Sequence, residues 1–477
     1  MSSKETLLKV GDQTTKPTWR HFLILPSLFT LFVGSQIYTY VLNEWTQARM
    51  KEQYFPNSSL DANVSACGNS DKTSLEYQQY KQVQQQSANW LIFYNLGESV
   101  PMAFMNIVIT AYTDSFGRKF LILLTIFGTF FKSGMISLIV TFDWSPVWVV
   151  VANIVLGCTG GAFGLFSAVF AFVADMTYTD EHRIIGIVVI ECVVMGSAIV
   201  APYLSGYFVE TLGLGFSKTS FICVGMCFFS FLLLLIIPES IAKHNRQKAR
   251  SIFQNIKRVT DFYVSKEMKG QRARYILLML SFWFATVTAM SRTSIETLYF
   301  LGQPFCWGPS KIGLFMTARH AAQSIIGLGA LPLLQICLSN QVIAIISTVS
   351  LTISYIIEGL AQSTLVIYFV PILGVFSFLM IPMIRGMMSN ITPADKQGAM
   401  FAGVAVFEVI SSLVGSIAFN GVYSQTMTFM NGFVFLSMAF LSMVDTVMLL
   451  VYNCIKPKPN AISVAHVNQE TYSEDNV

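Results

Sequence analysis

Charged residues are scarce in this chain of 477 residues: Asp, Glu, Lys and Arg together make up only 12%. That share is about half of what soluble domains carry, whereas hydrophobic residues reach 53%. The imbalance excludes an ordinary soluble globular protein. Because the net charge is only +4, there is no basic surplus of the kind that indicates a nucleic-acid partner. We therefore expect no nucleic acid among its partners.

Motifs that would indicate an enzyme are missing as well. The sequence contains neither a P-loop nor a convincing nucleophile elbow. Its five histidines are scattered, and no His/Cys cluster has the spacing of a metal site. We predict that the chain is not an enzyme and that it holds no metal and no cofactor.

Long apolar runs are what the sequence has instead. They recur in two sets of six, and each run is long enough to cross about 30 Å of hydrocarbon as a helix. The sequence therefore predicts an all-α membrane protein with about twelve transmembrane helices in two six-helix bundles. The runs lie near residues 22–42, 89–112, 120–142, 147–174, 184–208, 219–237, 275–301, 311–336, 341–361, 363–389, 399–424 and 430–454.

The polar segments divide the chain into its predicted parts. Residues 1–20 form a polar tail without a cleavable signal, so the first apolar run is expected to stay as an anchor. The two bundles are predicted over 21–238 and 275–454. A basic connection over 239–274 joins them, and a polar tail over 455–477 follows.

Cations are concentrated on one side of the predicted bundles. They gather in the first tail, in the connection between the bundles, and at Arg118 and Lys119. The short loops on the opposite side hold almost none beyond Lys218 and Lys311. The positive-inside rule therefore predicts both termini in the cytosol. Within the connection, residues 251–263 fit either an amphipathic helix on the membrane surface or a flexible linker.

One long polar loop, residues 43–88, is predicted on the opposite side. It contains two glycosylation acceptors, Asn57 and Asn63, which agree with an extracellular or lumenal position. Cys67 in this loop and Cys306 in a later one are the two cysteines predicted outside the membrane. Oxidising conditions on that side permit a bridge between them.

Ionisable residues inside the apolar runs are the main functional signal, because charge is costly in hydrocarbon and usually faces a cavity or a partner. Glu98 and Lys132 lie at similar depth, which allows a structural salt bridge. Glu296 and Glu358 lie near the ends of their runs, so they are expected to reach the membrane interface. The full set is Glu98, Lys132, Glu191, Arg292, Glu296, Arg319, His320, Glu358, Arg385, Glu408 and Asp445.

A short polar turn carries a first family resemblance. Asp114-Ser-Phe-Gly-Arg-Lys119 resembles the loop after the second span of major facilitator transporters, although the leading glycine of that pattern is Thr110 here. Gly117 would supply the turn between two membrane helices. The resemblance implies that Asp114, Gly117 and Arg118 latch the gate on the cytoplasmic side and do not touch the substrate.

Further short motifs, taken together in order and spacing, resemble the solute carrier 46 family, which includes the proton-coupled folate transporter and its lysosomal relatives. The resemblance implies that Glu191 couples protons, that Arg385 contributes to substrate and proton affinity, and that Cys67 and Cys306 form the outer disulfide. The motifs are Phe172-Val-Ala-Asp175, Ile190-Glu191, Pro304-Phe-Cys-Trp-Gly-Pro-Ser-Lys-Ile-Gly-Leu314, Pro382-Met-Ile-Arg385, Gln397-Gly-Ala-Met-Phe-Ala-Gly-Val-Ala405, Phe419-Asn-Gly-Val-Tyr423 and Asn431-Gly-Phe-Val-Phe-Leu436.

These observations predict the major facilitator fold and alternating-access symport of an organic anion with protons. Arg385 would bind the anion, because its guanidinium offers fixed positive charge to a carboxylate or phosphate. Arg319 and His320 are further candidates, and Glu408 is a carboxylate that could balance Arg385. We expect a monomer in the plasma membrane or the lysosomal membrane.

The identity of the anion stays open. Two positions depart from the folate transporter, since Gly161 stands in place of an acid and Ala289 in place of a histidine. Folate-like, nucleotide-like, muropeptide-like and steroid-conjugate anions therefore all remain candidates. One alternative is a membrane receptor or scaffold that binds a ligand without moving it. Another is a facilitator of neutral solutes such as sugars, a group that Pro238-Glu239-Ser240 resembles weakly.

Overall fold

The computed structural model describes residues 18–55, 75–176, 180–240, 272–392 and 397–455. Within these ranges every regular element is a helix, as the sequence predicts. The N-terminal half contains η1 (Trp19–Leu23), α2 (Ile24–Tyr54), α4 (Leu75–Phe116), α5 (Arg118–Thr141), α6 (Val147–Cys158), α7 (Gly161–Met176), α8 (Asp180–Gly206), η2 (Tyr207–Thr211) and α9 (Gly215–Ile236).

The C-terminal half repeats this all-helical organisation, with two of its spans broken into shorter pieces. It contains α11 (Arg272–Leu301), α12 (Pro309–Ala321), η5 (Ala322–Leu328), α13 (Gly329–Cys337), α14 (Asn340–Leu360), α15 (Thr364–Ile367), α16 (Phe369–Leu373), η6 (Ser377–Leu379), α17 (Met380–Asn390), α18 (Gln397–Thr426) and α19 (Phe433–Cys454).

Most of these elements can cross a membrane. Ten helices in the described ranges are long and apolar enough, and the pair Thr364–Leu373 and Ser377–Asn390, which is bent by 45° at its break, adds an eleventh. The helix at the second predicted span, α4, is not among these. With α4 included, the helices correspond to the twelve apolar runs.

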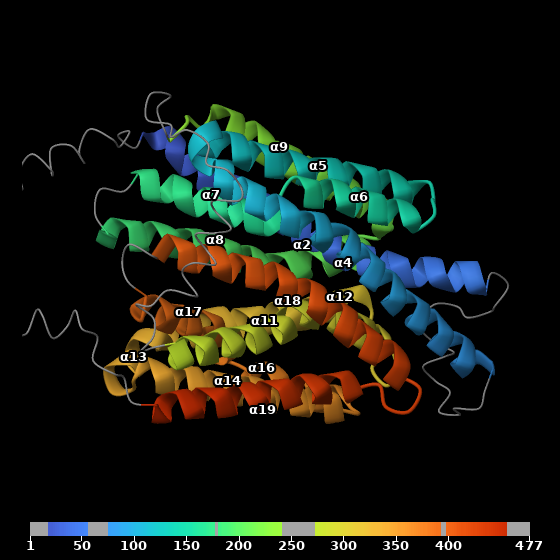
Figure 1. Cartoon of the computed structure of the whole chain (residues 1–477). Coiled ribbons are helices and arrows are strands. Elements are labelled where there is room, and N and C mark those ends of the chain that lie inside the picture. Colours follow the sequence, from blue (N-terminus) through green and yellow to red (C-terminus); the bar gives the residue numbers. More distant parts are fainter. Residues whose placement is uncertain (1–17, 56–74, 177–179, 241–271, 393–396, 456–477) are drawn as a thin grey trace, which may run out of the picture.

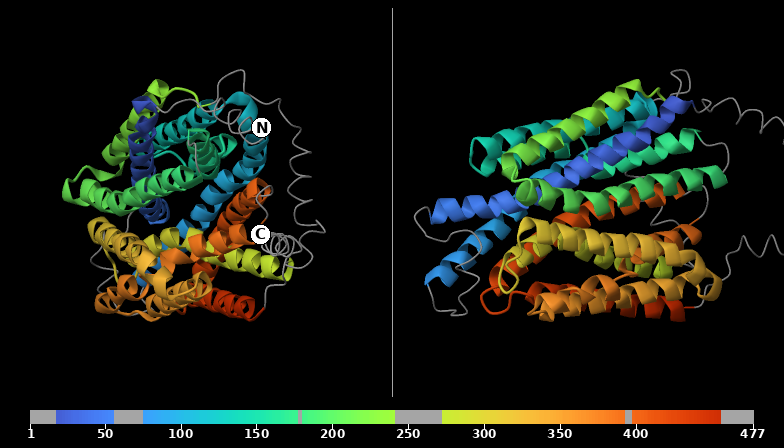
Figure 2. Two further views of the ribbon diagram at one scale, coloured as in Figure 1. Left: turned by 90° about the vertical axis from the view of Figure 1, so that its left-hand side faces the viewer. Right: turned by 180° about the vertical axis from the view of Figure 1, so that it is seen from behind.

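The two halves lie side by side as separate helical layers (Figure 1). We call the end where α2 begins and α19 ends the terminal end, and the end where α2 ends and α4 begins the distal end. Figure 2 looks along the bundles from the terminal end in its left panel and shows the same two groups of helices. The contacts between the halves are most extensive where α4 meets α18 and where α8 meets α12.

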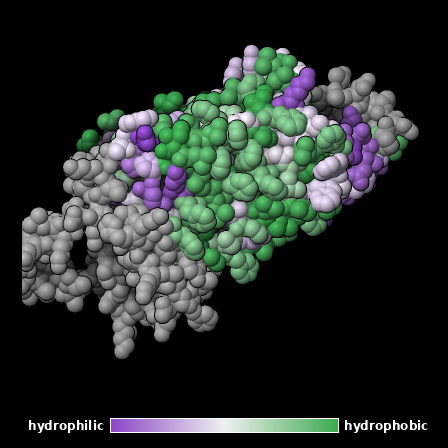
Figure 3. Space-filling view, turned by 90° about the horizontal axis from the view of Figure 1, so that it is seen from above, coloured by the Kyte–Doolittle hydropathy of each residue, from purple (hydrophilic) through white to green (hydrophobic). Residues whose placement is uncertain are grey.

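Exposed hydrophobic side chains cover the middle of the molecule. Ile325 and Phe104, for example, expose 67% and 69% of their surface. Figure 3 shows this hydrophobic surface between more polar regions at the two ends. In water such a surface would be unfavourable, whereas lipid tails cover it without cost. The chain is therefore a multi-pass membrane protein.

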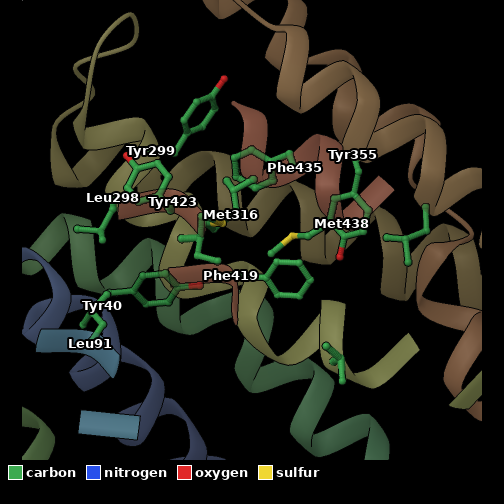
Figure 4. Packing of buried hydrophobic residues seen from close by; sticks show 14 of the residues in the cluster. Tyr40, Leu91, Leu298, Tyr299, Met316, Tyr355, Phe419, Tyr423, Phe435 and Met438 are labelled. Carbon is green, nitrogen blue, oxygen red and sulfur yellow. The ribbon is translucent and has the colours of Figure 1, made fainter. Parts of the chain in front are cut away.

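A hydrophobic cluster joins the two halves inside the molecule. It includes Tyr40 and Leu91 from the N-terminal half and Leu298, Met316 and Phe419 from the C-terminal half. Figure 4 shows these side chains facing one another from helices far apart in the sequence. Burial of this apolar surface helps to hold α2 and α4 against α11 and α18.

Hydrogen bonds close the distal end. Tyr80 Oη donates to the Leu301 carbonyl oxygen at 2.7 Å, and Ser310 N donates to Glu210 Oε2 at 2.7 Å. Every hydrogen bond that the structure describes between the halves lies in this distal part of the helices. The others join Gln84 to Leu298, Lys81 to Met427 and Asn431, Ser310 to Gly206 and Thr211, and Thr317 to Ile199.

The close approach of α12 to α8 depends on Gly313, and we predict that Gly313→Ala disfavours closure of the distal end. A Cβ at this position would stand 2.2 Å from the Pro202 carbonyl oxygen. Such overpacking costs about 1–3 kcal/mol. Ser310→Cys, at a position that lies between the halves, serves as the reporter. In the Gly313→Ala variant we expect this cysteine to react about tenfold faster with a membrane-impermeant maleimide than in the control variant. Gly329→Ala is the control, because nothing lies within 4 Å of its added Cβ. Equal labelling in both variants would contradict this prediction.

The predicted outer features lie mostly outside the described residues. Cys306 is disulfide-bonded, but its predicted partner Cys67 lies in a part of the chain that is not described, as do Asn57, Asn63 and residues 251–263. The pairing of Cys67 with Cys306 and the glycosylation of both asparagines therefore stay predictions.

The Cys67–Cys306 bridge can be tested on the intact protein. Because it closes a very long loop, it would stabilise the fold by about 3–5 kcal/mol in the chain-entropy model. Protease cleavage in the connection between the halves should leave them joined on electrophoresis until reductant is added. If the halves separate without reductant, these two cysteines do not form the bridge.

Candidate functional site

The first charged site lies between the two halves and combines three of the predicted residues. Arg385 of α17 donates from its guanidinium Nη2 to Glu408 Oε1 of α18, and it lies over the Phe282 ring at 5.7 Å from the centroid. Glu191 of α8, from the opposite half, interacts electrostatically with both. We call Glu191, Arg385 and Glu408 the central triad.

The central triad is partly open to solvent. The Arg385 and Glu408 side chains expose 29% and 13% of their surface, and Glu191 is exposed. These groups face one another across the halves, and the distal end above them is closed. Solvent therefore reaches the triad from the terminal end.

Charge balance determines what the central triad can bind. One guanidinium lies between two carboxylates, so an additional anion is repelled while both carboxylates are ionised. Protons on Glu191 and Glu408 would leave Arg385 as the one uncompensated charge of the triad. The triad can therefore bind a carboxylate or phosphate of a ligand together with protons.

A second charged group is fully buried in the C-terminal half. Arg292 of α11 donates from Nε to Glu296 Oε1 at 2.6 Å and from Nη2 to Glu358 Oε2 at 2.7 Å. Arg319 of α12 also binds Glu296 Oε1, and Arg292 Nη2 is 3.1 Å from Ser354 Oγ. We call Arg292, Glu296, Arg319 and Glu358 the buried network.

The buried network corrects one expectation. Glu296 and Glu358 do not reach the membrane interface, because both side chains are 0% exposed. Although both lie near the ends of their apolar runs, the arginines of α11 and α12 bind them inside the bundle. A buried ion pair offsets the cost of removing each charge from water, which an isolated carboxylate could not do.

The structure thus separates the predicted substrate-binding residues into two groups. Arg385 and Glu408 lie in the central triad with Glu191. Arg319 lies in the buried network, and His320 is its half-buried neighbour, close enough to interact electrostatically with Arg319 and Arg292. No residue of the described chain joins His320 to the triad by a hydrogen bond.

The predicted gate residues lie at the terminal end. Gly117 has a φ of 98°, a conformation that only glycine adopts at low cost, and α5 begins directly after it. Arg118 Nε donates to Asp175 Oδ2 at 3.1 Å, and Ser240 Oγ donates to the same oxygen at 2.9 Å. Glu239 Oε1 accepts from Arg118 N at 2.9 Å, which caps the start of α5.

Arg118 therefore links the start of α5, the end of α7 and the segment after α9 in the distally closed state. The side chain of Asp114 lies outside the described residues, so its predicted part in the gate is not placed. The contact of Glu239 with the start of α5 was not predicted, although Pro238-Glu239-Ser240 after the sixth span was the signal that could have indicated it.

Glu98 and Lys132 form the structural pair that their similar depth allows, with Lys132 Nζ 2.7 Å from Glu98 Oε2. This pair joins α4 to α5 within the N-terminal half and does not contact the central triad through any hydrogen bond described. Among the described residues no group of His, Cys, Asp and Glu is arranged to hold a metal ion.

Comparison with known proteins points to one class of relatives. The Major Facilitator Superfamily model matches residues 73–295. The lysosomal proton-coupled steroid conjugate and bile acid symporter of Gallus gallus is 24% identical over 428 residues, covering 88% of this chain and 92% of that protein. The proton-coupled folate transporter of Rattus norvegicus is 24% identical over 393 residues, covering 82% and 84%.

Solved structures are similar at the level of the fold. The D-xylose-proton symporter has a TM-score of 0.66 at 15% identity, covering 92% of this chain and 98% of that one. The human organic anion transporter MFSD10 has a TM-score of 0.60 at 13% identity, covering 91% and 100%.

Proposed function

Because this chain belongs to the major facilitator superfamily and resembles the solute carrier 46 transporters, we propose that it moves an organic anion together with protons. It is a transporter and not an enzyme. Its fold, two six-helix bundles of the major facilitator type, is the one predicted from the sequence.

The observation that carries the proposal is the central triad. Arg385 is contributed by one half of the molecule and Glu191 by the other, and Glu408 already binds Arg385. An anion can replace Glu408 on the guanidinium only after the carboxylates take up protons. Proton binding and anion binding are therefore favourable together, which is the requirement for symport.

The direction of coupling follows from the same charges. On an acidic side, protons neutralise Glu191 and Glu408, and Arg385 binds the anion. When the site opens to a less acidic side, the carboxylates lose their protons and Glu408 binds Arg385 again. The anion is then repelled and leaves. The present arrangement, with Arg385 bound to Glu408 and open to the terminal end, corresponds to the state after release.

The distribution of cations indicates which end of the molecule faces the cytosol. With both termini in the cytosol, as the distribution of cations predicts, the distal end faces the lumen or the extracellular space. The Gallus gallus relative is named as lysosomal. A lysosomal or plasma membrane location would therefore let an acidic lumen or exterior supply the protons.

The names of the relatives suggest which anions to try. Steroid conjugates, bile acids and folate appear in those names, and all three classes carry an anionic group on a large ring system. A neutral solute would have no use for Arg385, and a receptor that only binds would have no use for the gate that the resemblance assigns to Asp114, Gly117 and Arg118. Both alternatives are less well supported by the residues present.

Uptake into proteoliposomes tests the proposal. Tritiated steroid sulfate, bile acid and folate should be offered with the distal face in acidic or neutral buffer, and a neutral sugar should be included. We expect at least one anion to accumulate only with the proton gradient. No accumulation of any anion, or gradient-independent movement of the sugar alone, would overturn the proposed function.

A further inference from the structure

The buried network contains polar atoms that make no hydrogen bond with the described residues. Glu296 Oε2, Glu358 Oε1 and Arg319 Nε are buried and have no hydrogen-bond partner among the described residues. The carboxylates of Glu296 and Glu358 are 0% exposed, and the Arg319 side chain is 3% exposed. Unpartnered buried polar atoms are costly. A purely structural network would be expected to satisfy them.

The network lies next to the surface where the two halves meet. Arg319 interacts electrostatically with Tyr40 of α2, which belongs to the opposite half. Two residues earlier on α12, Thr317 Oγ1 donates to the Ile199 carbonyl oxygen of α8 at 2.8 Å. The N-terminal half therefore covers this side of the network while the distal end is closed.

Alternating access must remove that cover. When the distal end opens, α2 separates from α11 and α8 from α12, because their contacts are among those that close it. The side of Arg319 that now faces Tyr40 then faces the entry path. The central triad is reached from the opposite, terminal end in the present state.

We propose that the buried network is a second anion site, which binds the anionic group of the substrate through Arg319 and Arg292 when the distal end is open. This inference rests on the proposed function. The network contains two guanidiniums and two carboxylates, so a bound anion needs one proton for charge balance. Glu358 is assigned that proton, because it pairs with one arginine, whereas Glu296 is shared by two.

In the present structure Arg292 Nη2 donates to Glu358 Oε2. Loss of the Glu358 charge frees this donor for a ligand. Arg319 Nε is already unpartnered among the described residues. The two guanidiniums can then offer donors to one carboxylate, sulfate or phosphate. The titratable and charged groups that face the network are Tyr40 on α2, Arg292, Glu296 and Tyr299 on α11, Arg319 and His320 on α12, and Tyr355 and Glu358 on α14.

The test compares the two faces of the membrane. Initial uptake of the tritiated steroid sulfate, bile acid and folate is measured in right-side-out and inside-out vesicles, in acidic and neutral buffer. Arg319→Lys keeps the charge but loses the planar fork, so we expect its half-saturating concentration to rise about tenfold at the distal face. At the terminal face the change should stay within about twofold. Arg49→Lys, in an exposed ion pair, is the matched control.

A second variant tests the proton. Glu358→Gln mimics the protonated carboxyl, so affinity at the distal face should depend less on pH than in the wild type while the protein still folds. Equal effects of Arg319→Lys at both faces, or unchanged pH dependence in Glu358→Gln, would overturn the second site alone. Failure of the wild type to take up any of the three anions would overturn the proposed function and the second site with it.

Discussion

Glu191→Gln is expected to abolish accumulation driven by a proton gradient while leaving substrate exchange intact. A gradient of about two pH units is worth about 2.7 kcal/mol per proton, or about a hundredfold in concentration ratio. Glutamine resembles the protonated carboxyl in shape but cannot release a proton. The variant should therefore equilibrate the anion across the membrane, within about twofold of the wild-type exchange rate, without concentrating it.

The control for this variant is Glu52→Gln. Glu52 lies in the same half, and its ion pair with Arg49 is exposed, so its removal should change stability by less than about 1 kcal/mol. Accumulation and exchange are measured side by side in proteoliposomes with equal amounts of protein. If Glu191→Gln still concentrates the anion in response to the gradient, protons are coupled through another group.

Arg385→Lys should weaken the affinity for the anion about tenfold to a hundredfold, which corresponds to about 1.4–2.8 kcal/mol. Lysine retains a positive charge but lacks the planar fork that binds two oxygens of a carboxylate at once. Because Glu408 would still find a cation nearby, we expect the protein to fold. The half-saturating concentration should rise much more than the maximal rate falls.

Two companion variants make this result interpretable. Glu408→Gln removes the carboxylate that competes with the anion for Arg385, so affinity should become less dependent on pH. Arg49→Lys, in an ion pair with the exposed Glu52, should leave the affinity unchanged. An unchanged half-saturating concentration in Arg385→Lys would mean that the Arg385–Glu408 pair is structural.

Much of the fold could be predicted from the sequence, because whether a run spans the membrane depends on its own length and hydropathy. A run that is long and apolar enough forms a spanning helix wherever its partners lie. Even α4, interrupted by Asn95, Glu98 and Asn106, was found in this way. The turn at Gly117 was also predictable, since two spanning helices joined by so few residues need an unusual backbone conformation there.

The candidate site was only partly predictable. Resemblance pointed to Glu191 and Arg385, and the cost of a buried cation suggested Glu408 as a partner, which the structure bears out as a contact. The roles of these residues remain proposals. Glu296 and Glu358 were misplaced at the interface, because position along a run does not reveal which way a side chain faces. The spacing of Arg292 and Glu296, four residues apart on one helix, was a usable signal.

What the sequence determined by itself is therefore what one segment decides alone: which runs span, where the chain turns, and which ionisable residues enter the membrane. Only the tertiary structure decided which of those charges meet. Glu191 reaches Arg385 from the opposite half, and Arg292 reaches Glu358 across a gap of 66 residues. Such pairs depend on how each helix is rotated and crossed against its neighbours. Packing sets that rotation, and hydropathy along one run does not encode it.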